Sequence, residues 1–328
     1  MSPPPLTSVL LVGPFEGADI TQTLDSVLAQ TTPVEVLVVG NGSAPEALTV
    51  ATTRATTDPR MRVLTDITSL GFAKAHNEAA REAKGQALLI LTPGIVVPSP
   101  DALSQLLHFA AGIKKRPWGI GARLVDHEGR EAPIARRAFL TPLTAVIELL
   151  RLFSLPGLPE RWRAWLLARR FRPSHLPWRE GLTPVQVLCS AFLFIPLKDF
   201  TLLHGFKEGY DTEGSLEDLD FALRLARAEG CLYATWEITV TWVPRRAMAP
   251  SGWRSRLHTT RSLSNYFHRH FSYTWPQPAL WLLDAGLYVR WFGQNCRAWI
   301  AEVTAPLRQR LTWLLHATEF LLPRRRRR

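Results

Sequence analysis

Short apolar runs rich in branched residues alternate with amphipathic stretches along the first third of the chain. The runs, each bounded by glycine, proline or polar residues, predict buried strands at 8–12, 34–39, 61–65 and 87–91. Helical periodicity between them predicts helices at 20–30, 44–54 and 73–84. This alternation predicts an α/β fold with a mainly parallel sheet covered by helices on both faces. Ligands of such sheets bind beyond the carboxyl ends of the strands, which places candidate residues at 13–16, 40–43 and 92–96.

The remainder of the chain divides into two parts. Strands are predicted at 118–122 and 185–196, and a helix at 216–229. The sequence then becomes helical and rich in arginine and tryptophan. We therefore predict one domain over residues 1–248 and a basic helical extension over residues 249–328.

Composition narrows the class of protein. The 328 residues are 46% hydrophobic and 20% charged, which is typical of a globular chain with a sizeable core. The three cysteines are odd in number and widely spaced, so neither a disulfide framework nor a zinc site is indicated. The start of the sequence lacks a secretory signal pattern, and no uninterrupted apolar run reaches 18 residues. These features predict a cytoplasmic protein that does not span a membrane.

The net charge of +11 is concentrated in two stretches. Residues 136–179 hold nine arginines against two acidic residues, and residues 254–328 hold thirteen against three. The same stretches contain eight of the twelve tryptophans. Arginine interleaved with tryptophan suits a helix lying on an anionic membrane surface, which is the interpretation we favour. Ordinary amphipathic helices packed on the domain are the alternative. Nucleic acid is not expected as a partner, because no recognisable binding motif accompanies the charge.

Five segments fall in the order and spacing seen in one enzyme family. They are 24–30, 36–43, 70–77, 85–94 and 217–230, the last resembling a helix that begins with an acidic pair. Together they resemble the family 2 inverting glycosyltransferases over roughly residues 8–245. Residues 121–129 are similar to a segment of the subset resembling rhamnosyltransferases of cell-envelope polysaccharide assembly. The resemblance implies a glycosyltransferase A-type fold, Rossmann-like, and a nucleotide-sugar donor.

An inverting transfer needs a carboxylate that takes the proton from the attacking acceptor hydroxyl. Glu217, Asp218 and Asp220 lie at the start of a predicted helix, where the helix dipole favours carboxylates. The resemblance assigns the catalytic positions to Glu217 and Asp218, with Asp218 as the general base. It assigns Arg123, Asp126 and Asp220 to the acceptor side. The alternative is an ordinary acidic helix start.

The donor side departs from the family pattern. Gly40 replaces an aspartate that grips the nucleotide base, Gly94 replaces the metal-binding aspartate, and Thr241 and Trp242 replace a histidine. Divalent Mg or Mn is the family norm, but the expected ligands are missing, so no metal-binding residue is assigned. The predicted donor-binding residues are Gly13, Pro14, Phe15, Gly40, Asn41, Lys74, His76, Asn77, Thr92 and Gly94.

Two interpretations of Lys74 and His76 stay open. Either they supply a fixed cation that partly replaces the metal, or they are ordinary solvated residues at a helix start. The histidine-rich segment 266–270 is predicted to be an exposed helical turn rather than a metal site, because no acidic or cysteine partners are nearby in sequence. Residues 294–299 nearly match a Gln-x-x-Arg-Trp motif of processive synthases, but one residue intrudes, and we attribute the match to chance.

The leading hypothesis is a glycosyltransferase that is peripheral on the inner face of the plasma membrane. It would move a sugar from a nucleotide diphosphate donor to a lipid-linked or cell-envelope glycan acceptor. The rival hypothesis is a catalytically degenerate relative that keeps the fold as a binding or assembly subunit.

Overall fold

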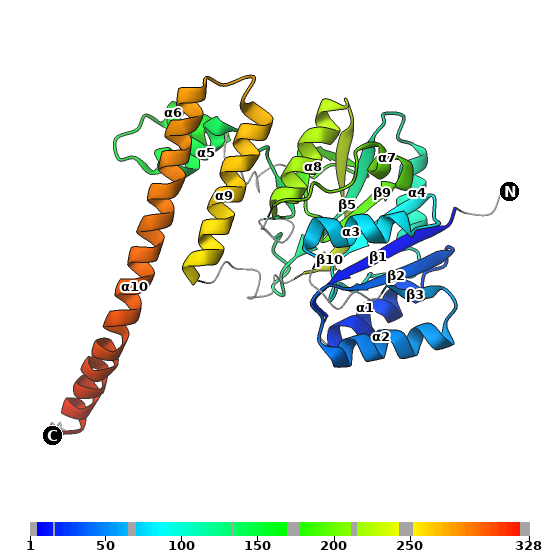
Figure 1. Cartoon of the computed structure of the whole chain (residues 1–328), viewed down its shortest axis with the longest axis horizontal. Coiled ribbons are helices and arrows are strands. Elements are labelled where there is room, and N and C mark those ends of the chain that lie inside the picture. Colours follow the sequence, from blue (N-terminus) through cyan, green and yellow to red (C-terminus); the bar gives the residue numbers. More distant parts are fainter. Residues whose placement is uncertain are drawn as a thin grey trace, which may run out of the picture.

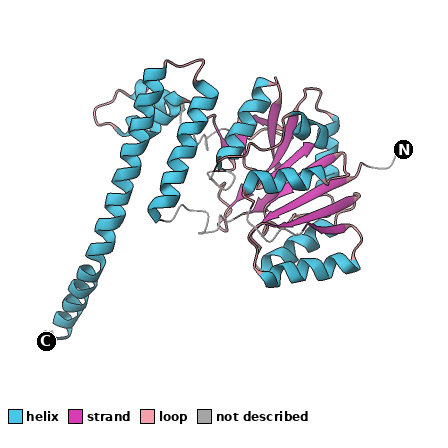
Figure 2. Ribbon diagram, in the orientation of Figure 1, coloured by secondary structure: helices cyan, strands magenta, loops and turns pink. Residues whose placement is uncertain are grey.

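The computed structural model describes residues 5–15, 17–64, 70–132, 134–168, 178–210, 215–242 and 252–321. These form a body built on one large sheet and a pair of long helices beside it (Figure 1). Strands are confined to the body, and the region beside it is helical (Figure 2).

The large sheet has the strand order β3-β2-β1-β4-β9-β5-β10-β7. Its strands are β1 (Thr7–Gly13), β2 (Val34–Gly40), β3 (Met61–Leu64), β4 (Ala87–Leu91), β5 (Trp118–Val125), β7 (Thr183–Val185), β9 (Phe192–Pro196) and β10 (Cys231–Thr241). Strands β3, β2, β1 and β4 are parallel neighbours, and β10 is parallel to β5. Strand β9 runs antiparallel to both β4 and β5, and β7 is antiparallel to β10. Strands β6 (Arg136–Arg137) and β8 (Val187–Leu188) form a second, two-stranded sheet.

The helices lie on both faces of the large sheet and in the region beside it. They are α1 (Gly17–Leu28), α2 (Pro45–Thr57), α3 (Phe72–Arg81), α4 (Ala102–Ala111), α5 (Pro142–Leu149), α6 (Glu160–Ala168), α7 (Leu197–Leu202), α8 (Ser215–Arg227), α9 (Gly252–Phe271) and α10 (Gln277–Leu321), with a short 3₁₀ helix η1 (Leu152–Ser154). Apolar residues of α1, α2 and α4 pack on one face, and those of α3, α7 and α8 pack on the other.

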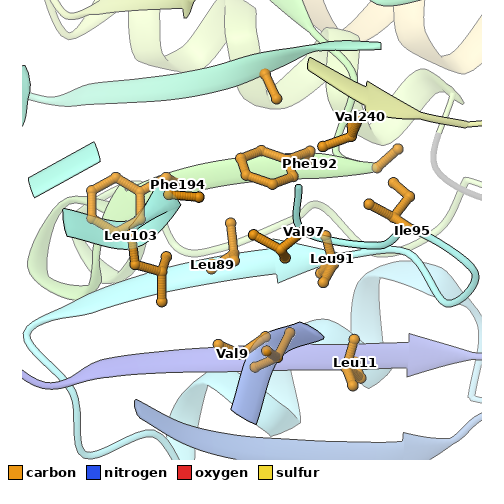
Figure 3. Close-up of a cluster of buried hydrophobic side chains, with 14 of the residues drawn as sticks. Val9, Leu11, Leu89, Leu91, Ile95, Val97, Leu103, Phe192, Phe194 and Val240 are labelled. Carbon is orange, nitrogen blue, oxygen red and sulfur yellow. The ribbon is translucent and has the colours of Figure 1, made fainter. Parts of the chain in front are cut away.

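The period of two along each strand explains why both faces are buried. Val9 and Leu11 of β1 belong to the core on one face, whereas Leu10 and Val12 belong to the core on the other. Figure 3 shows part of the first core, where residues of β1 lie in line with Leu89 of β4 and Phe192 of β9. A strand buried on both faces reads as a continuous apolar run, which is the pattern that predicted it.

The predicted architecture, a mainly parallel sheet flanked by helices with a helical region at the C-terminal end, is confirmed. The single strand predicted at 185–196 is wrong, because β8 pairs in the small sheet and only β9 enters the large sheet beside β4. Pairing partners, which the apolar pattern does not encode, decide that difference. The predicted domain boundary at residue 248 lies outside the described residues.

Helix α9 is anchored on α8 by buried side chains. Tyr266, Phe267 and His270 are all buried, so the exposed turn predicted at 266–270 is wrong. The His270 Nε2 lies 2.7 Å from Asp220 Oδ1, and Arg227 donates to the His270 carbonyl at 2.7 Å. Arg227 Nη1 also lies 3.0 Å from His270 Nδ1. Since arginine can only donate, Nδ1 accepts and Nε2 carries the proton that is donated to Asp220.

Helix α10 continues from α9 and brings the two arginine-rich stretches together. Leu280, Leu283 and Leu287 of its first turns are buried. A Cβ on Gly286 would lie 2.6 Å from Leu149 Cδ2, so α10 and α5 approach closely at this point. Helix α10 is 45 residues long, or roughly 68 Å at 1.5 Å per residue, and extends past the body (Figure 1). Among the helices of the described residues, none is both long and apolar enough to cross a bilayer.

The anchoring of α9 leads to a stability prediction. His270→Ala should lower the free energy of unfolding by about 2 kcal/mol, because a buried hydrogen bond to a carboxylate and packing against Tyr266 are lost. His268→Ala is the matched control: it removes a hydrogen bond of the same length to Asp284, but the His268 side chain is 33% exposed against 3% for His270. The control should cost under about 1 kcal/mol. Urea denaturation measures both, and equal losses would contradict the anchoring.

Candidate active site

The ends of β1 and β2 are joined by one serine. Gly13 and Gly40 are register partners at the carboxyl ends of these strands. The Ser43 hydroxyl donates to the Gly13 carbonyl at 2.8 Å and accepts from the Phe15 N–H at 3.1 Å. The two loops that were predicted to bind the donor therefore form one unit. Pro14 is exposed, but the Phe15 side chain is buried in the core, so Phe15 presents only backbone to this loop. Glu16 lies outside the described residues.

Gly40 and Asn41 are tied to neighbouring elements. A Cβ on Gly40 would overlap the Leu48 side chain of α2, so a larger residue requires Leu48 to move. The Asn41 Oδ1 accepts the Leu70 N–H at 2.8 Å. The Asn41 side chain thus fixes the chain just before α3.

The turn after β4 lies beside the end of β1. A Cβ on Gly13 would come within 3.6 Å of Pro93. The Thr92 N–H donates to the Ala191 carbonyl at 2.9 Å, and the Gly94 N–H donates to Thr23 Oγ1 at 3.0 Å. Gly94 has a φ of +92°, a conformation that side chains with a Cβ rarely adopt. An aspartate at position 94 would rarely adopt this backbone conformation.

Helix α3 carries an exposed cation in its first turn. Lys74 is exposed, whereas the His76 ring is buried between Phe72 and Phe206 and its Nδ1 lies 2.8 Å from the Phe72 carbonyl. Burial lowers the pKa of His76 to about 4, so the ring is neutral. Both predictions for His76, a fixed cation and a solvated residue, are wrong. The Asn77 amide bonds both backbone groups of Phe206, at 2.8 and 2.9 Å, and so fixes the turn before Tyr210.

Asp218 lies in the first turn of α8 and is only 5% exposed. Its Oδ2 accepts from Arg137 Nη2 at 2.6 Å, and its Oδ1 accepts the Ser190 N–H at 3.2 Å. Burial raises the pKa of Asp218 above its ordinary value, although Arg137 and Ser190 act in the opposite direction. Burial, together with the Asp218 charge, also raises the pKa of the neighbouring Cys189 to about 12, so that thiol stays protonated and is not a nucleophile.

One loop connects Asp218 with the strand ends. The Ala191 carbonyl accepts from Thr92 after β4, and the adjacent Ser190 N–H donates to Asp218. The candidate base and the β4 end, which are 126 positions apart at residues 92 and 218, therefore contact the same loop. Loop 189–191 therefore contacts one predicted donor-binding residue, Thr92, and one predicted catalytic residue, Asp218.

Glu217 and Asp220, the other two acidic residues at the start of α8, have surroundings that differ from those of Asp218. Glu217 is fully buried in α8. Asp220 is also fully buried, and its carboxylate bonds Tyr210 at 3.1 Å, Arg224 at 2.6 Å and His270 at 2.7 Å. The predicted acceptor-side role of Asp220 is therefore wrong. Burial would raise its pKa, but the His270 hydrogen bond and the Arg224 charge hold the pKa of Asp220 below its ordinary value.

Arg123 and Asp126 lie at the end of β5 and in the turn after it. Asp126 Oδ1 accepts the N–H groups of Glu128 and Arg130 at 2.9 and 3.0 Å, and Oδ2 accepts from Arg130 Nε at 3.0 Å. These bonds shape its own turn. Arg123 is half-buried in the strand. Their acceptor-side role stays a prediction.

The described residues do not fit a divalent cation at the strand ends. Thr92, Pro93 and Gly94 follow β4, and Gly40 ends β2, so no carboxylate is present at either place. Within the described ranges no three His, Cys, Asp or Glu residues are grouped as a metal site would require. Trp242 is buried and donates its N–H to the Val125 carbonyl at 2.8 Å.

Arg137 is the site residue that the sequence analysis missed. It was counted only as part of a cationic stretch. The sequence does contain a signal for it, the adjacent pair Arg136 and Arg137. In an extended segment two consecutive side chains point to opposite sides, so at least one arginine of the pair faces inward.

Comparisons with known proteins agree with this fold. Residues 15–115 match the family model described as glycosyl transferase family 2. The chain is 36% identical over 128 residues to the O-antigen biosynthesis protein RfbC of Myxococcus xanthus, a match that covers 37% of this chain and 10% of that protein. The chain thus spans about a tenth of the length of the curated relative it matches.

Solved glycosyltransferase structures are similar at low identity. GalNAc-T7 with UDP, GalNAc and Mn²⁺ has a TM-score of 0.54 at 16% identity, covering 90% of this chain and 57% of that chain. The Pyrobaculum calidifontis mannosyltransferase PcManGT with GDP-Man and Mn²⁺ gives 0.47 at 16% identity, covering 98% and 82%. S. aureus TarS 1-349 with UDP-GlcNAc gives 0.48 at 15% identity, covering 81% and 72%. The likeness to GalNAc-T7 shows that the chain has the glycosyltransferase A-type fold.

Proposed function

We propose that the protein is an inverting glycosyltransferase with Asp218 as its general base. It moves a sugar from a nucleotide diphosphate donor to a lipid-linked or cell-envelope glycan acceptor. The observation that carries the proposal is the placement of the buried Asp218 carboxylate on loop 189–191, which also contacts the carboxyl end of β4. The family 2 match over residues 15–115 supports a nucleotide-sugar donor, and the likeness to an O-antigen biosynthesis protein supports an envelope glycan.

In this mechanism Asp218 accepts the proton of the acceptor hydroxyl while the oxygen bonds to the anomeric carbon. The bond from that carbon to the phosphate breaks on the opposite side, and its electrons leave with the diphosphate. A raised pKa makes Asp218 a stronger proton acceptor than an ordinary carboxylate, as long as it stays below the working pH. Lys74, which is exposed in the first turn of α3, supplies positive charge to the departing diphosphate.

The same observations define the rival function. Because the ends of β2 and β4 carry no carboxylates, a subunit that binds a glycan or nucleotide without turning it over is the alternative. Turnover separates the two functions, since a binding subunit would have none.

Helix α10 supports action at a membrane surface. Its exposed large apolar side chains recur at helical spacing and are Trp281, Leu282, Tyr288, Val289, Phe292, Trp299 and Ile300. We call this set the α10 stripe. Arg290 and Arg297 are exposed beside it, and Trp162 and Trp165 of α6 are exposed as well. Aromatic rings and arginines on one helix suit the headgroup layer of an anionic bilayer, so we propose peripheral association with the inner face of the plasma membrane.

The base assignment is tested by Asp218→Asn. Turnover should fall by roughly a hundredfold to ten-thousandfold, the usual contribution of a positioned base. The fold should persist, because the amide oxygen can still accept the Arg137 hydrogen bond. The exposed Asp101→Asn is the control and should keep full turnover. Undiminished transfer by the Asp218→Asn protein would show that the base is another residue.

The missing carboxylates predict weak dependence on divalent metal. Transfer in excess chelator should stay within a few-fold of its value with Mg or Mn, because the ends of β2 and β4 offer no carboxylate ligand. Gly94→Asp and Gly94→Ala should both lower stability by about 1 kcal/mol or more, given the φ of +92°. Only the aspartate variant should gain a response to metal. Complete loss of wild-type transfer in chelator, restored by Mn, would show that ligands exist elsewhere.

The α10 stripe predicts reversible binding to anionic vesicles. Sedimentation with phosphatidylglycerol vesicles at low salt should be strong, should weaken as salt rises, and should be poor with phosphatidylcholine. The double variant Phe292→Ser, Trp299→Ser should bind at least about tenfold less, since each large apolar side chain contributes roughly 1.5–3 kcal/mol when buried. Leu202→Ser, on an equally exposed residue of α7, is the control. A double variant that binds like the control would leave the stripe without a lipid role. Point variants are preferred to a truncation near residue 250, which would remove the buried part of α9.

A further inference from the structure

Two consecutive arginines of β6 are buried and make different ion pairs. Arg136 is 4% exposed, pairs with Glu131 through two bonds of 2.6 and 2.7 Å, and lies 4.0 Å from the Trp178 ring centroid. Arg137 is 2% exposed, and its Nη2 donates to Asp218 Oδ2 at 2.6 Å and to the Leu188 carbonyl at 3.3 Å. The strand thus directs one arginine to a carboxylate outside the candidate site and the other to the candidate base.

We propose that Arg137 is a positioning residue that holds the Asp218 carboxylate in one orientation, with Oδ1 as the oxygen that receives the acceptor proton. The inference rests on the proposed function, and neither the family resemblance nor the similar proteins assign a role to this arginine. Oδ2 faces the guanidinium, and a cation at 2.6 Å disfavours a proton on that oxygen. Oδ1 accepts the Ser190 N–H at 3.2 Å, and the Ser190 side chain also hydrogen-bonds the Asp218 carboxylate. Neither Ser190 group is a cation, so a proton is disfavoured less on Oδ1 than on Oδ2.

The free energy of folding is a weak reason for burying the Arg137–Asp218 ion pair. Taking two charges out of water costs several kcal/mol per ion, and well-packed apolar residues in their place are often as stable or more so. A buried pair of which one member is the candidate base has a second role available, because proton transfer requires the base to be held within hydrogen-bond reach of its target. Leu188 and Ser190 flank Cys189, so Arg137 and Asp218 are both fixed to the same short segment.

The groups around Asp218 give the direction of the pH effect. Arg137 of β6 is the cation that faces it, Glu217 is adjacent on α8, and Cys189 precedes Ser190 in the loop. The Cys189 thiol is protonated at neutral pH. Tyr266 of α9 is near enough to feel the Arg137 charge, and burial raises the pKa of its hydroxyl, so it too stays neutral. Loss of Arg137 removes a charge that lowers the pKa of Asp218, so that pKa rises and the base is protonated up to a higher pH.

The experiment compares Arg137→Met, Arg137→Lys and Arg136→Met in the full chain. Turnover is measured against pH at saturating donor and acceptor, together with KM and the thermal midpoint. Arg137→Met should lower kcat by about a hundredfold or more and move the acid limb of the profile to higher pH. Arg137→Lys should keep the acid limb near that of the wild type, because the charge remains. It should lower kcat, because the shorter lysine side chain does not place an N–H where Arg137 Nη2 bonds both partners. Arg136→Met should lose comparable thermal stability with a wild-type acid limb.

Each outcome decides between two roles. An Arg137→Met protein with the wild-type acid limb and a loss of kcat no larger than that of Arg136→Met makes the pair structural and overturns the inference. If Arg137→Met does not fold, Arg137→Lys decides: unchanged kcat overturns the inference, and lowered kcat with an unmoved acid limb supports it. Asp218→Asn separates this result from failure of the proposed function. An active Asp218→Asn protein removes the base assignment itself, whereas an inactive one beside a wild-type-like Arg137→Met removes only the role of Arg137.

Discussion

The burial of carboxylates in the first two turns of α8 constrains how the second half of the chain folds. A buried charge costs several kcal/mol unless it is paired and hydrogen-bonded. Asp218 is paired with Arg137, 81 positions earlier, and Asp220 is paired with His270, 50 positions later. Without Arg137 and His270 beside it, α8 would bury unpaired carboxylates. The small sheet β6–β8 and helix α9 are therefore packed where these charges require them.

The donor side of the site is built without acidic side chains. Strands β1 and β2 end in glycines that pair in register, and β4 ends in Thr92, Pro93 and Gly94. Gly40 and Gly94 are suited to their surroundings, since Gly40 lies against Leu48 and Gly94 has a positive φ. The electrostatics of the described site are consequently asymmetric. The Asp218 carboxylate is buried on α8, whereas the cation Lys74 is exposed in the first turn of α3.

The basic extension has two physical parts. Helix α9 belongs to the body, because its Tyr266, Phe267 and His270 are buried against α8. Helix α10 buries Leu280 and Leu283, and between them it already exposes Trp281 and Leu282 of the α10 stripe. Packed and exposed side chains thus occur in one continuous helix. Whether a residue is buried depends on the side of the helix on which it lies.

The sequence by itself determined the α/β class, the order of β1 to β4 and their helices, and the acidic start of α8, because a strand buried on both faces leaves a continuous apolar run and a helix leaves a 3.6-residue period. Only the tertiary structure decided that β9 runs antiparallel beside β4, that His76 is neutral and buried, and that Asp220 is bonded to His270. It also selected Arg137 rather than Arg136 as the partner of Asp218. Local periodicity specifies which residues are buried, whereas pairing between residues tens of positions apart depends on how the elements pack, and that information is absent from any short window of the chain.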